Sequence, residues 1–378
     1  MSNVVIAGYA RSPFHLANKG ALAKVRPDDM AAQVIRALVE RTGVDASKIE
    51  DIVMGCAFPE GEQGFNVARL VGLLADLPIS VGGMTVNRFC GSSMSAIHIA
   101  AGMIEMDAGD AFICAGVESM SRVPMMGFNP MPNPKLAKET EAYISMGDTA
   151  ENVANKYEID RATQEAFAVR SQEKARDAIA AGRLTDEIVP IDDGRGNTVS
   201  EDGTPRPDTT AETLASLKTA FQAEGTVTAG TASPLTDGAV ATLVTSEEFA
   251  RANNLPILAR IKSIAISGCG PEIMGIGPVE ASRKALERAG ITVDQLDVVE
   301  LNEAFASQSL ACIRDLGLDE SKVNIDGGAI AIGHPLGATG ARITGKAAEI
   351  LKREGGKYAL ATQCIGGGQG IATVLEAI

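Results

Sequence analysis

The chain has 378 residues, enough for two ordinary domains, and its 45% apolar content supplies material for buried cores. A formal charge of −14 disfavours nucleic acid and anionic membranes, so a small-molecule substrate or a basic partner is expected. No run of about eighteen apolar residues and no secretory N-terminal pattern occurs. We therefore expect a cytoplasmic protein without a membrane span.

Cysteine and histidine usage limits the chemistry further. The six cysteines are scattered and none forms a CxxC pair, which predicts reduced thiols rather than a disulfide framework. The three histidines do not cluster, so no metal site is expected. A bound cofactor is not expected either. Two of them, His15 in a loop and His98 in a packed helix, lack a glycine-rich setting and are interpreted as structural.

The first elements along the chain alternate between strand and helix. Residues 4–8 form an apolar run typical of a buried strand, and residues 28–42 have helical periodicity that stops at Gly43. Residues 52–55 then predict another strand. This alternation favours an α/β architecture.

A second copy of this unit occurs late in the chain, because residues 37–43 resemble residues 285–290. A helix motif of this kind can recur by chance in α/β proteins, but the spacings that follow also match. Cys90 and His334 lie at similar distances beyond the two copies, and each opens a run rich in Gly, Ser and Ala. We therefore expect two duplicated halves whose equivalent strand-to-helix junctions each contribute a catalytic residue.

Between the two copies the sequence changes character. Residues 124–134 are rich in proline, residues 163–182 predict an amphipathic helix, and residues 192–208 look irregular and charged. Long excursions of this kind usually cover a functional site. The predicted domains are an N-terminal half (1–120, continued by about 229–252), a loop domain (121–228) and a C-terminal half (253–378).

The strongest candidate nucleophile is Cys90, which follows a strand-like stretch and precedes a small-residue helix. A cysteine at a helix N-terminus has its thiolate stabilised by oriented N–H groups, and small neighbours let a carbonyl approach. The alternative is an inert buried thiol, which is the common state of a free cysteine.

His334 lies within a glycine-rich segment, residues 327–340, at the start of another helix. A histidine in that setting can act as a general base near neutral pH, and Pro335 fixes the chain direction beside it. The alternative is a structural turn in which the histidine has no chemical role.

Two further segments carry candidate groups. Cys364 ends an apolar strand and is followed by glycines, including Gly366, whose backbone N–H groups could form an oxyanion hole. The run lacks the Lys-Ser/Thr pair of a phosphate-binding loop. Asn302 follows a buried strand and could hold a water molecule or polarise a carbonyl, although an N-cap is the simpler interpretation.

Together these four segments resemble the thiolase family, whose blocks are Cys-Gly-Ser, Asn-Glu-Ala-Phe, Gly-His-Pro and a late Cys-x-Gly. The resemblance covers essentially the whole chain. It implies a five-layered αβαβα fold, with two duplicated βαβαβαββ halves and an inserted loop domain. It also implies an acyltransferase with coenzyme A as substrate and a homodimeric or homotetrameric assembly.

Carried over by position, the resemblance implies that Cys90 becomes acylated, His334 activates it, and Cys364 handles the α-carbon proton of the acetyl group. It implies two oxyanion sites. One combines His334 with a water held by Asn302, and the other uses the backbone N–H groups of Cys90 and Gly366. Residues implied to meet coenzyme A or the acyl and pantetheine channel are Lys218, Ser233, Met146 and Phe305.

The motifs also bear on the branch of the family. Biosynthetic acetoacetyl-CoA thiolases carry a histidine before the Met-Gly of the loop domain, where this chain has Ser145. Residues 87–94 and 272–278 also look closer to degradative 3-ketoacyl-CoA thiolases of fatty acid β-oxidation. We favour that branch, with condensation of two acetyl-CoA as the alternative.

Two alternative classes of protein are disfavoured by the catalytic motifs. A decarboxylating ketoacyl synthase resembles this fold but uses a cysteine with two histidines, whereas here Cys364 stands where the second histidine would be wanted. A non-catalytic acyl-CoA-binding protein is disfavoured by the intact set of Cys90, Asn302, His334 and Cys364.

Overall fold

The N-terminal half is built on one mixed five-stranded sheet. In a computed structural model that describes residues 3–378, its strands lie in the order β1-β8-β5-β3-β4. The flanking strands β3 and β4 are parallel to each other and to β5, whereas β8 is antiparallel to its neighbours. The bounds are β1 Val4–Arg11, β3 Asp51–Gly55, β4 Gly82–Val86, β5 Ala111–Ser119 and β8 Thr236–Ser246, with a short β2 His15–Leu16 on β8.

The C-terminal half repeats this arrangement in the order β9-β12-β11-β10. In each half the first strand lies beside the last one, so the two sheets share one topology. An isolated parallel bridge from Val299 to Val323 extends the second sheet where β4 extends the first. The bounds are β9 Ala259–Gly268, β10 Val298–Leu301, β11 Tyr358–Ile365 and β12 Gln369–Glu376.

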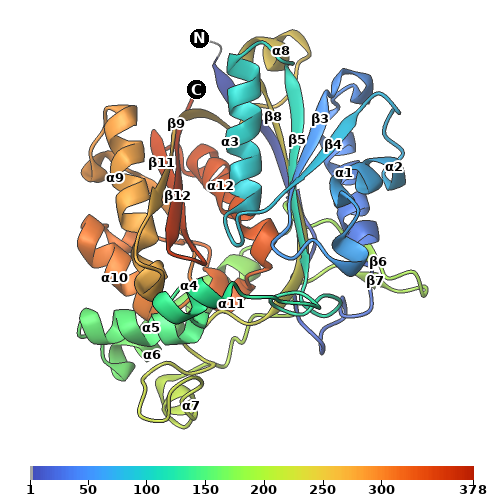
Figure 1. The fold of residues 1–378 in the computed structure, drawn as a ribbon. Helices are drawn as coiled ribbons and strands as arrows, with labels where there is room; N and C mark the ends of the chain where they lie inside the picture. Colours follow the sequence, from blue (N-terminus) through green and yellow to red (C-terminus); the bar gives the residue numbers. More distant parts are fainter. Residues whose placement is uncertain (1–2) are drawn as a thin grey trace.

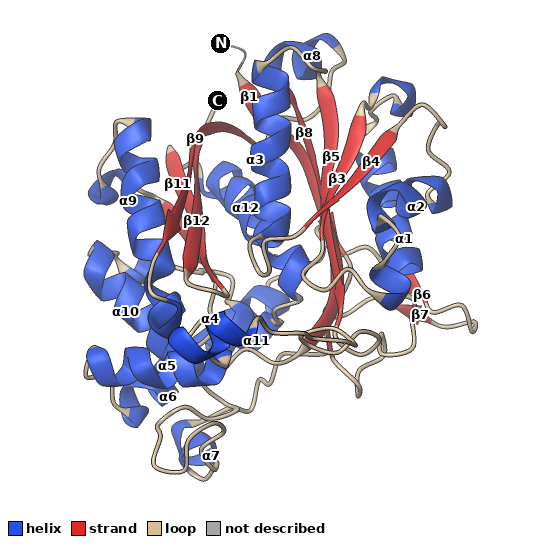
Figure 2. Cartoon of the chain, viewed as in Figure 1, coloured by secondary structure: helices blue, strands red, loops and turns tan. Residues whose placement is uncertain are grey.

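The halves meet where β1 pairs with β9, through Val5 with Arg260 and Ile6 with Ala259. Figures 1 and 2 show five layers, with α3 and α12 between the two sheets, α1 and α2 outside the first sheet, and α9 and α10 outside the second. The predicted αβαβα arrangement of two duplicated halves is confirmed. The bounds are α1 Pro27–Thr42, α2 Val67–Leu74, α3 Ser92–Glu105, α9 Gly277–Ala289, α10 Ala306–Leu316 and α12 Leu336–Glu354, with α8 Glu247–Ala252 capping β8.

The outer helices of the two repeats begin and end by the same local rules. Helix α1 has Pro27 at its first position and α9 has Pro278 near its start, where a missing N–H costs nothing. Both helices end on a glycine in the left-handed conformation, Gly43 at φ 70° and Gly290 at φ 66°. The helix predicted for residues 28–42 is confirmed.

The central helices pack unusually closely. A Cβ at Gly340 of α12 would collide with the backbone nitrogen of Met94 in α3, so this contact requires glycine. The Oγ of Ser93 accepts a hydrogen bond from the backbone N–H of Ala341, at 2.8 Å. The starts of α3 and α12 therefore lie side by side at the junction of the two halves.

The segment between β5 and β8 forms helices and loops beneath the layers (Figure 1). The helix predicted for residues 163–182 is present as α6. Residues 192–208 are not wholly irregular as expected, because Ile191 and Asp192 pair with Val199 and Thr198 in a small hairpin. The bounds are α4 Pro134–Glu139, α5 Met146–Lys156, α6 Arg161–Ala180, α7 Ala211–Ala215, β6 Ile191–Asp192, β7 Thr198–Val199 and, after β10, α11 Ala329–Ile332.

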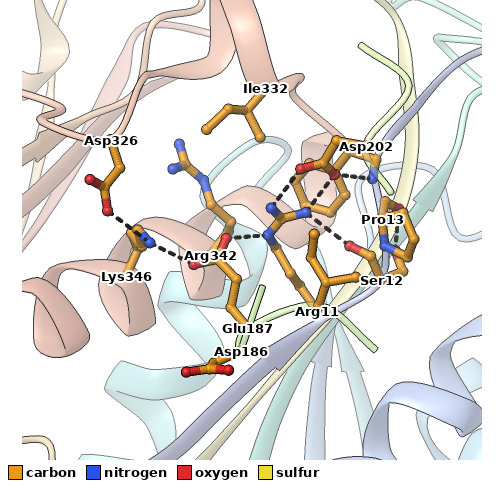
Figure 3. A network of polar contacts seen from close by, with 12 residues as sticks. Arg11, Ser12, Pro13, Asp186, Glu187, Asp202, Asp326, Ile332, Arg342 and Lys346 are labelled. Carbon is orange, nitrogen blue, oxygen red and sulfur yellow. Dashed lines mark hydrogen bonds and ion pairs between the residues drawn. The ribbon is translucent and has the colours of Figure 1, made fainter. Parts of the chain in front are cut away.

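A buried ionic network ties this segment to both halves (Figure 3). Arg11 of β1 pairs with Glu187 at 2.5 Å and with Asp202 at 2.7 Å. Lys346 of α12 pairs with Glu187 at 2.7 Å and with Asp326 at 3.0 Å. Because each charge has an opposite partner, the network can remain ionised away from water.

Residues 3–378 contain neither a membrane-spanning helix nor a metal-binding cluster. None of the helices in this range is long and apolar enough to cross a membrane. Within the same residues no group of three His, Cys, Asp or Glu side chains could hold a metal ion. All six cysteines are free thiols, as predicted.

Candidate active site

Cys90 lies in the turn between β4 and α3. The side chain of Asn87 accepts a hydrogen bond from the N–H of Phe89 at 2.8 Å, and Ser92 Oγ donates to the Phe89 carbonyl at 2.6 Å. Phe89 is held at φ 43°, in the left-handed region that non-glycine residues rarely adopt. This strained turn presents Cys90 two residues before α3 begins at Ser92, the helix-start position that the sequence predicted.

The C-terminal half forms hydrogen bonds with the same turn. The side-chain amide of Gln363 in β11 donates to the carbonyl oxygen of Cys90. The guanidinium of Arg88 donates to Gln369 Oε1 at 3.0 Å and to Ser95 Oγ at 2.9 Å. The Cys90 turn of one half is therefore fixed by the β11–β12 hairpin of the other.

Burial favours the protonated form of the Cys90 thiol. Burial raises its pKa to about 11, although hydrogen bonds from the backbone N–H groups of Gly366 and of Cys90 itself favour the thiolate. These are the two N–H groups that the sequence predicted for an oxyanion hole. A Cβ at Gly366 would contact the Phe89 ring at 3.5 Å and Met146 Sδ at 3.6 Å, so the hairpin, the turn and the loop segment converge here.

Cys364 is buried near Cys90. Burial raises the pKa of Cys364 well above its usual value, and the charge that Cys90 would carry raises it further. Cys364 therefore stays a neutral thiol, the form required of a proton donor. It packs in an apolar cluster with Phe305, Ala304 and Met274, and Met146 lies against the same cluster.

His334 lies in the equivalent junction of the C-terminal half, two residues before α12. Burial lowers its pKa to about 3, and the positive charge of Arg342 lowers it as well, so the imidazole is neutral. Its Nε2 lies 3.4 Å from Asn302 Nδ2. Asn302 is not an N-cap, because α10 begins after Phe305, and its Oδ1 is buried without a hydrogen-bond partner.

Backbone pairing brings these residues to one edge of the structure. Leu301 pairs with Thr362 in neighbouring parallel strands, so Asn302, directly after β10, and Cys364, near the end of β11, lie on the same side. The starts of α3 and α12 lie beside each other, as Ser93 and Ala341 show. The junctions that hold Cys90 and His334 are therefore adjacent.

Sequence reasoning missed Glu118 as a functional residue. Its buried carboxylate accepts hydrogen bonds from the N–H groups of Gly337 (2.9 Å) and Ala57 (2.8 Å) and from the amide of Gln63 (3.0 Å). Burial raises the pKa of Glu118, and these donors oppose that shift. Glu118 thus fixes the His334 junction to the N-terminal half, and only its setting in a Gly-Val-Glu-Ser-Met run hinted at this.

Of the expected coenzyme A contacts, Met146, Lys218 and Ser233 lie in the segment between β5 and β8, whereas Phe305 caps α10 in the C-terminal half. Lys218 is exposed after α7, and Ser233 is half-buried, with its Oγ donating to the Ala304 carbonyl at 3.1 Å. Phe305 is 8% exposed and its ring meets that of Phe221 at 6.0 Å. Ser233 and Phe305 lie at the same place as Cys364, whereas Lys218 lies on the outer surface. Of the other two histidines, His98 is buried in α3 against Thr373, as predicted. The loop position predicted for His15 is wrong, because this residue lies in the short strand β2 and bonds to the Glu201 carbonyl.

The chain matches known proteins over its whole length. Models described as "Thiolase, N-terminal domain" and "Thiolase, C-terminal domain" match residues 4–248 and 255–377. The chain is 47% identical over 390 aligned residues to the 3-ketoacyl-CoA thiolase of Bacillus subtilis (strain 168), with 100% of both chains covered.

Two solved structures superpose closely on this one. The Bacillus anthracis acetyl-CoA acetyltransferase does so with a TM-score of 0.92 at 40% identity, covering 100% of this chain and 99% of that chain. Human mitochondrial 3-ketoacyl-CoA thiolase gives a TM-score of 0.91 at 38% identity, with the same coverage. The duplicated fold and these matches define an acyltransferase. The chain belongs to the thiolase family, and the resemblance seen in its motifs is confirmed.

Proposed function

We propose that the protein is a 3-ketoacyl-CoA thiolase that cleaves 3-ketoacyl-CoA with free coenzyme A, giving acetyl-CoA and a shortened acyl-CoA in fatty acid β-oxidation. The observation that carries the proposal is the convergence of two thiols and a neutral imidazole at the junction of the two halves. Each group has the protonation state that its step needs. No metal or bound cofactor is required by this chemistry.

In the first half-reaction, Cys90 Sγ attacks the ketone carbon C3 while His334 Nε2 takes the thiol proton. The bond between C2 and C3 then breaks, its electron pair forms the acetyl-CoA enolate, and Cys364 donates its proton to C2. The acyl group remains on Cys90 as a thioester. The backbone N–H groups of Cys90 and Gly366 stabilise the oxyanion at C3, where charge develops.

In the second half-reaction, coenzyme A loses its thiol proton to the Cys364 thiolate and attacks the thioester. The tetrahedral intermediate collapses, Cys90 leaves, and the His334 imidazolium returns the proton to it. Every proton is thereby restored at the end of one turnover. Asn302 and His334 hold the thioester oxygen of acetyl-CoA through a water molecule, for which the unpartnered Asn302 Oδ1 is a ready acceptor.

An acyl-enzyme adduct tests the covalent step. Incubation with a 3-ketoacyl-CoA in the absence of free coenzyme A should add one acyl mass to the intact protein, and Cys90→Ala should abolish the adduct. Cys114→Ala is a matched control, because Cys114 is buried in β5 and should leave the adduct unchanged. An adduct that persists in Cys90→Ala contradicts the assignment of the nucleophile.

The chain-length profile separates this function from its alternative, an acetoacetyl-CoA thiolase. Ser145 caps α5 by accepting from the N–H of Asp148 at 3.1 Å, and the apolar Met146 follows it. Ser145 stands where biosynthetic acetoacetyl-CoA thiolases carry a histidine, and this difference supports the degradative branch. Activity on six- to ten-carbon 3-ketoacyl-CoAs is expected; activity confined to acetoacetyl-CoA would support the alternative.

Contacts to coenzyme A complete the proposed site. Ser233, Met146 and Phe305 line the approach to Cys364, and Lys218 offers a cation to the phosphates of a polyanionic substrate. Lys218→Ala should therefore raise KM for coenzyme A while kcat is retained. The domain division at residues 120, 228 and 252 and the cytoplasmic location also remain proposals.

The assembly we propose is a homodimer or homotetramer. In the strand order of residues 3–378, β4 stands at one end, and two apolar side chains in the segments next to it are largely exposed, Phe65 at 94% and Ile79 at 77%. An apolar edge strand of this kind is normally covered by a partner. Ile79→Asp should shift the mass measured by light scattering to that of a monomer.

A further inference from the structure

Both ring nitrogens of His334 face a buried side chain. Nδ1 lies 2.6 Å from Thr339 Oγ1, and Nε2 lies 3.4 Å from Asn302 Nδ2. The three residues are between 0% and 4% exposed, so these contacts are shielded from bulk solvent. The identity of the two partners restricts where the ring proton can be.

The amide nitrogen of Asn302 can only donate a hydrogen bond, so Nε2 must present its lone pair. The ring is neutral and carries one proton, which therefore belongs to Nδ1. Thr339 Oγ1 then accepts a hydrogen bond from Nδ1–H and donates one to the Pro335 carbonyl oxygen at 3.0 Å. Every donor in this chain of contacts meets an acceptor.

We propose that Thr339 is a positioning residue that keeps the proton of His334 on Nδ1 and leaves the Nε2 lone pair free to act as a base. The opposite tautomer would direct an N–H toward the amide of Asn302 and leave no base beside the nucleophile. The catalytic consequence rests on the proposed function, but the tautomer itself does not. Thr339 does not touch the reacting atoms and acts only through His334.

The first turn of α12 places Thr339 where this role requires it. The helix begins at Leu336, and the hydroxyl turns back to the carbonyl four residues earlier, beside the imidazole. Thr344 on the same helix makes the same kind of bond to the Gly340 carbonyl, at 2.7 Å, and is equally buried. Thr344→Val therefore provides a matched control for losing a buried hydroxyl from α12.

Nuclear magnetic resonance can read the tautomer directly, because the chain has only three histidines. In protein labelled with ¹⁵N-histidine, long-range ¹H–¹⁵N spectra distinguish a protonated ring nitrogen from an unprotonated one, and His15→Gln and His98→Gln assist assignment. We expect Nδ1–H for His334 in the wild type, in Thr339→Ser and in Thr344→Val. Thr339→Val should lose this single state and populate Nε2–H.

Kinetics supply the second readout. Thr339→Val leaves a buried donor unsatisfied, so kcat should fall roughly 10- to 100-fold with little change in KM. Thr339→Ser should restore most of the activity, and Thr344→Val should remain close to the wild type even if its melting temperature falls equally.

Two results would overturn the proposal. One is Nε2–H on His334 in the wild type, the state expected if Asn302 presented its oxygen to the ring. The other is a Thr339→Val variant with the wild-type tautomer and kcat. If Thr339→Val does not fold, the wild-type and Thr339→Ser spectra still decide the tautomer. A wild type without thiolase activity would refute the proposed function while leaving the tautomer assignment readable.

Discussion

Alkylation of Cys90 should depend steeply on pH. With a pKa of about 11, Cys90 is a thiolate in only about one molecule in ten thousand at pH 7, whereas an unperturbed thiol is about 3% ionised. Reaction with iodoacetamide at pH 7 should therefore be roughly 300-fold slower than for an unperturbed thiol of equal access. The rate should rise about tenfold per pH unit from pH 7 to pH 9.

The assay is loss of activity under excess iodoacetamide, sampled at half-unit pH intervals and confirmed by peptide mass. Cys269 is half-buried and is the main source of background, so Cys269→Ser should be used as the parent protein. Burial also raises the pKa of Cys269, so this background should be small.

The opposite state would give a distinct profile. A resting thiolate–imidazolium pair between Cys90 and His334 would react quickly and almost independently of pH from pH 6 to pH 8. Such a plateau would refute the reasoning, because it requires the pKa of Cys90 to lie below that of His334. The structure gives the reverse order, about 11 against about 3.

The remaining predictions concern stability and the junction between the halves. Lys346→Met breaks the buried ion pair with Glu187 and should lower the free energy of unfolding, measured by denaturant titration, by about 3 kcal/mol. Lys284→Met is the control, because it removes an exposed ion pair of 3.9 Å and should change the free energy of unfolding by less than about 0.5 kcal/mol. Gly340→Ala should lower the free energy of unfolding by about 1–3 kcal/mol, because the added methyl group forces α3 and α12 apart. Gly102→Ala should raise it by about 0.5–1 kcal/mol, because a Cβ at Gly102 of α3 meets nothing within 4 Å. Glu118→Gln should lower kcat about tenfold, because it weakens the contact with the Gly337 N–H. The same variant should speed alkylation of Cys90, because a nearby negative charge is lost. An equal decrease in kcat and in the alkylation rate would contradict this role.

Much of the fold could be predicted because its signals are local. All eight residues of β1 are buried, so the strand appears as an apolar run, and Gly43 marks the end of α1 through its own conformation. The hairpin of β6 and β7 could not be predicted, because two-residue strands have no periodicity. The pairing of β1 with β9 spans the two halves and leaves no local trace.

The residues of the candidate site also fall into a group that local sequence signals identify and a group that they do not. Cys90 and His334 were predictable because each lies in a small-residue segment at a helix start, and their spacing repeats. Glu118 was not, because the N–H it binds at Gly337 lies 219 residues away in sequence. Thr339 also looked like an ordinary helix residue, since its partner is identified only by the direction of the imidazole ring.

The two sulfur atoms also determine the order of the chemical steps. A negative charge on Cys90 raises the pKa of Cys364, so two thiolates are disfavoured in the same buried space. Cys364 can therefore release its proton only after Cys90 has become a neutral thioester, which is when the enolate needs it. His334, held neutral by burial and Arg342, is free to accept the first proton. The low-dielectric junction thus allows one anionic sulfur at a time, and this enforces the sequence of attack, cleavage and protonation.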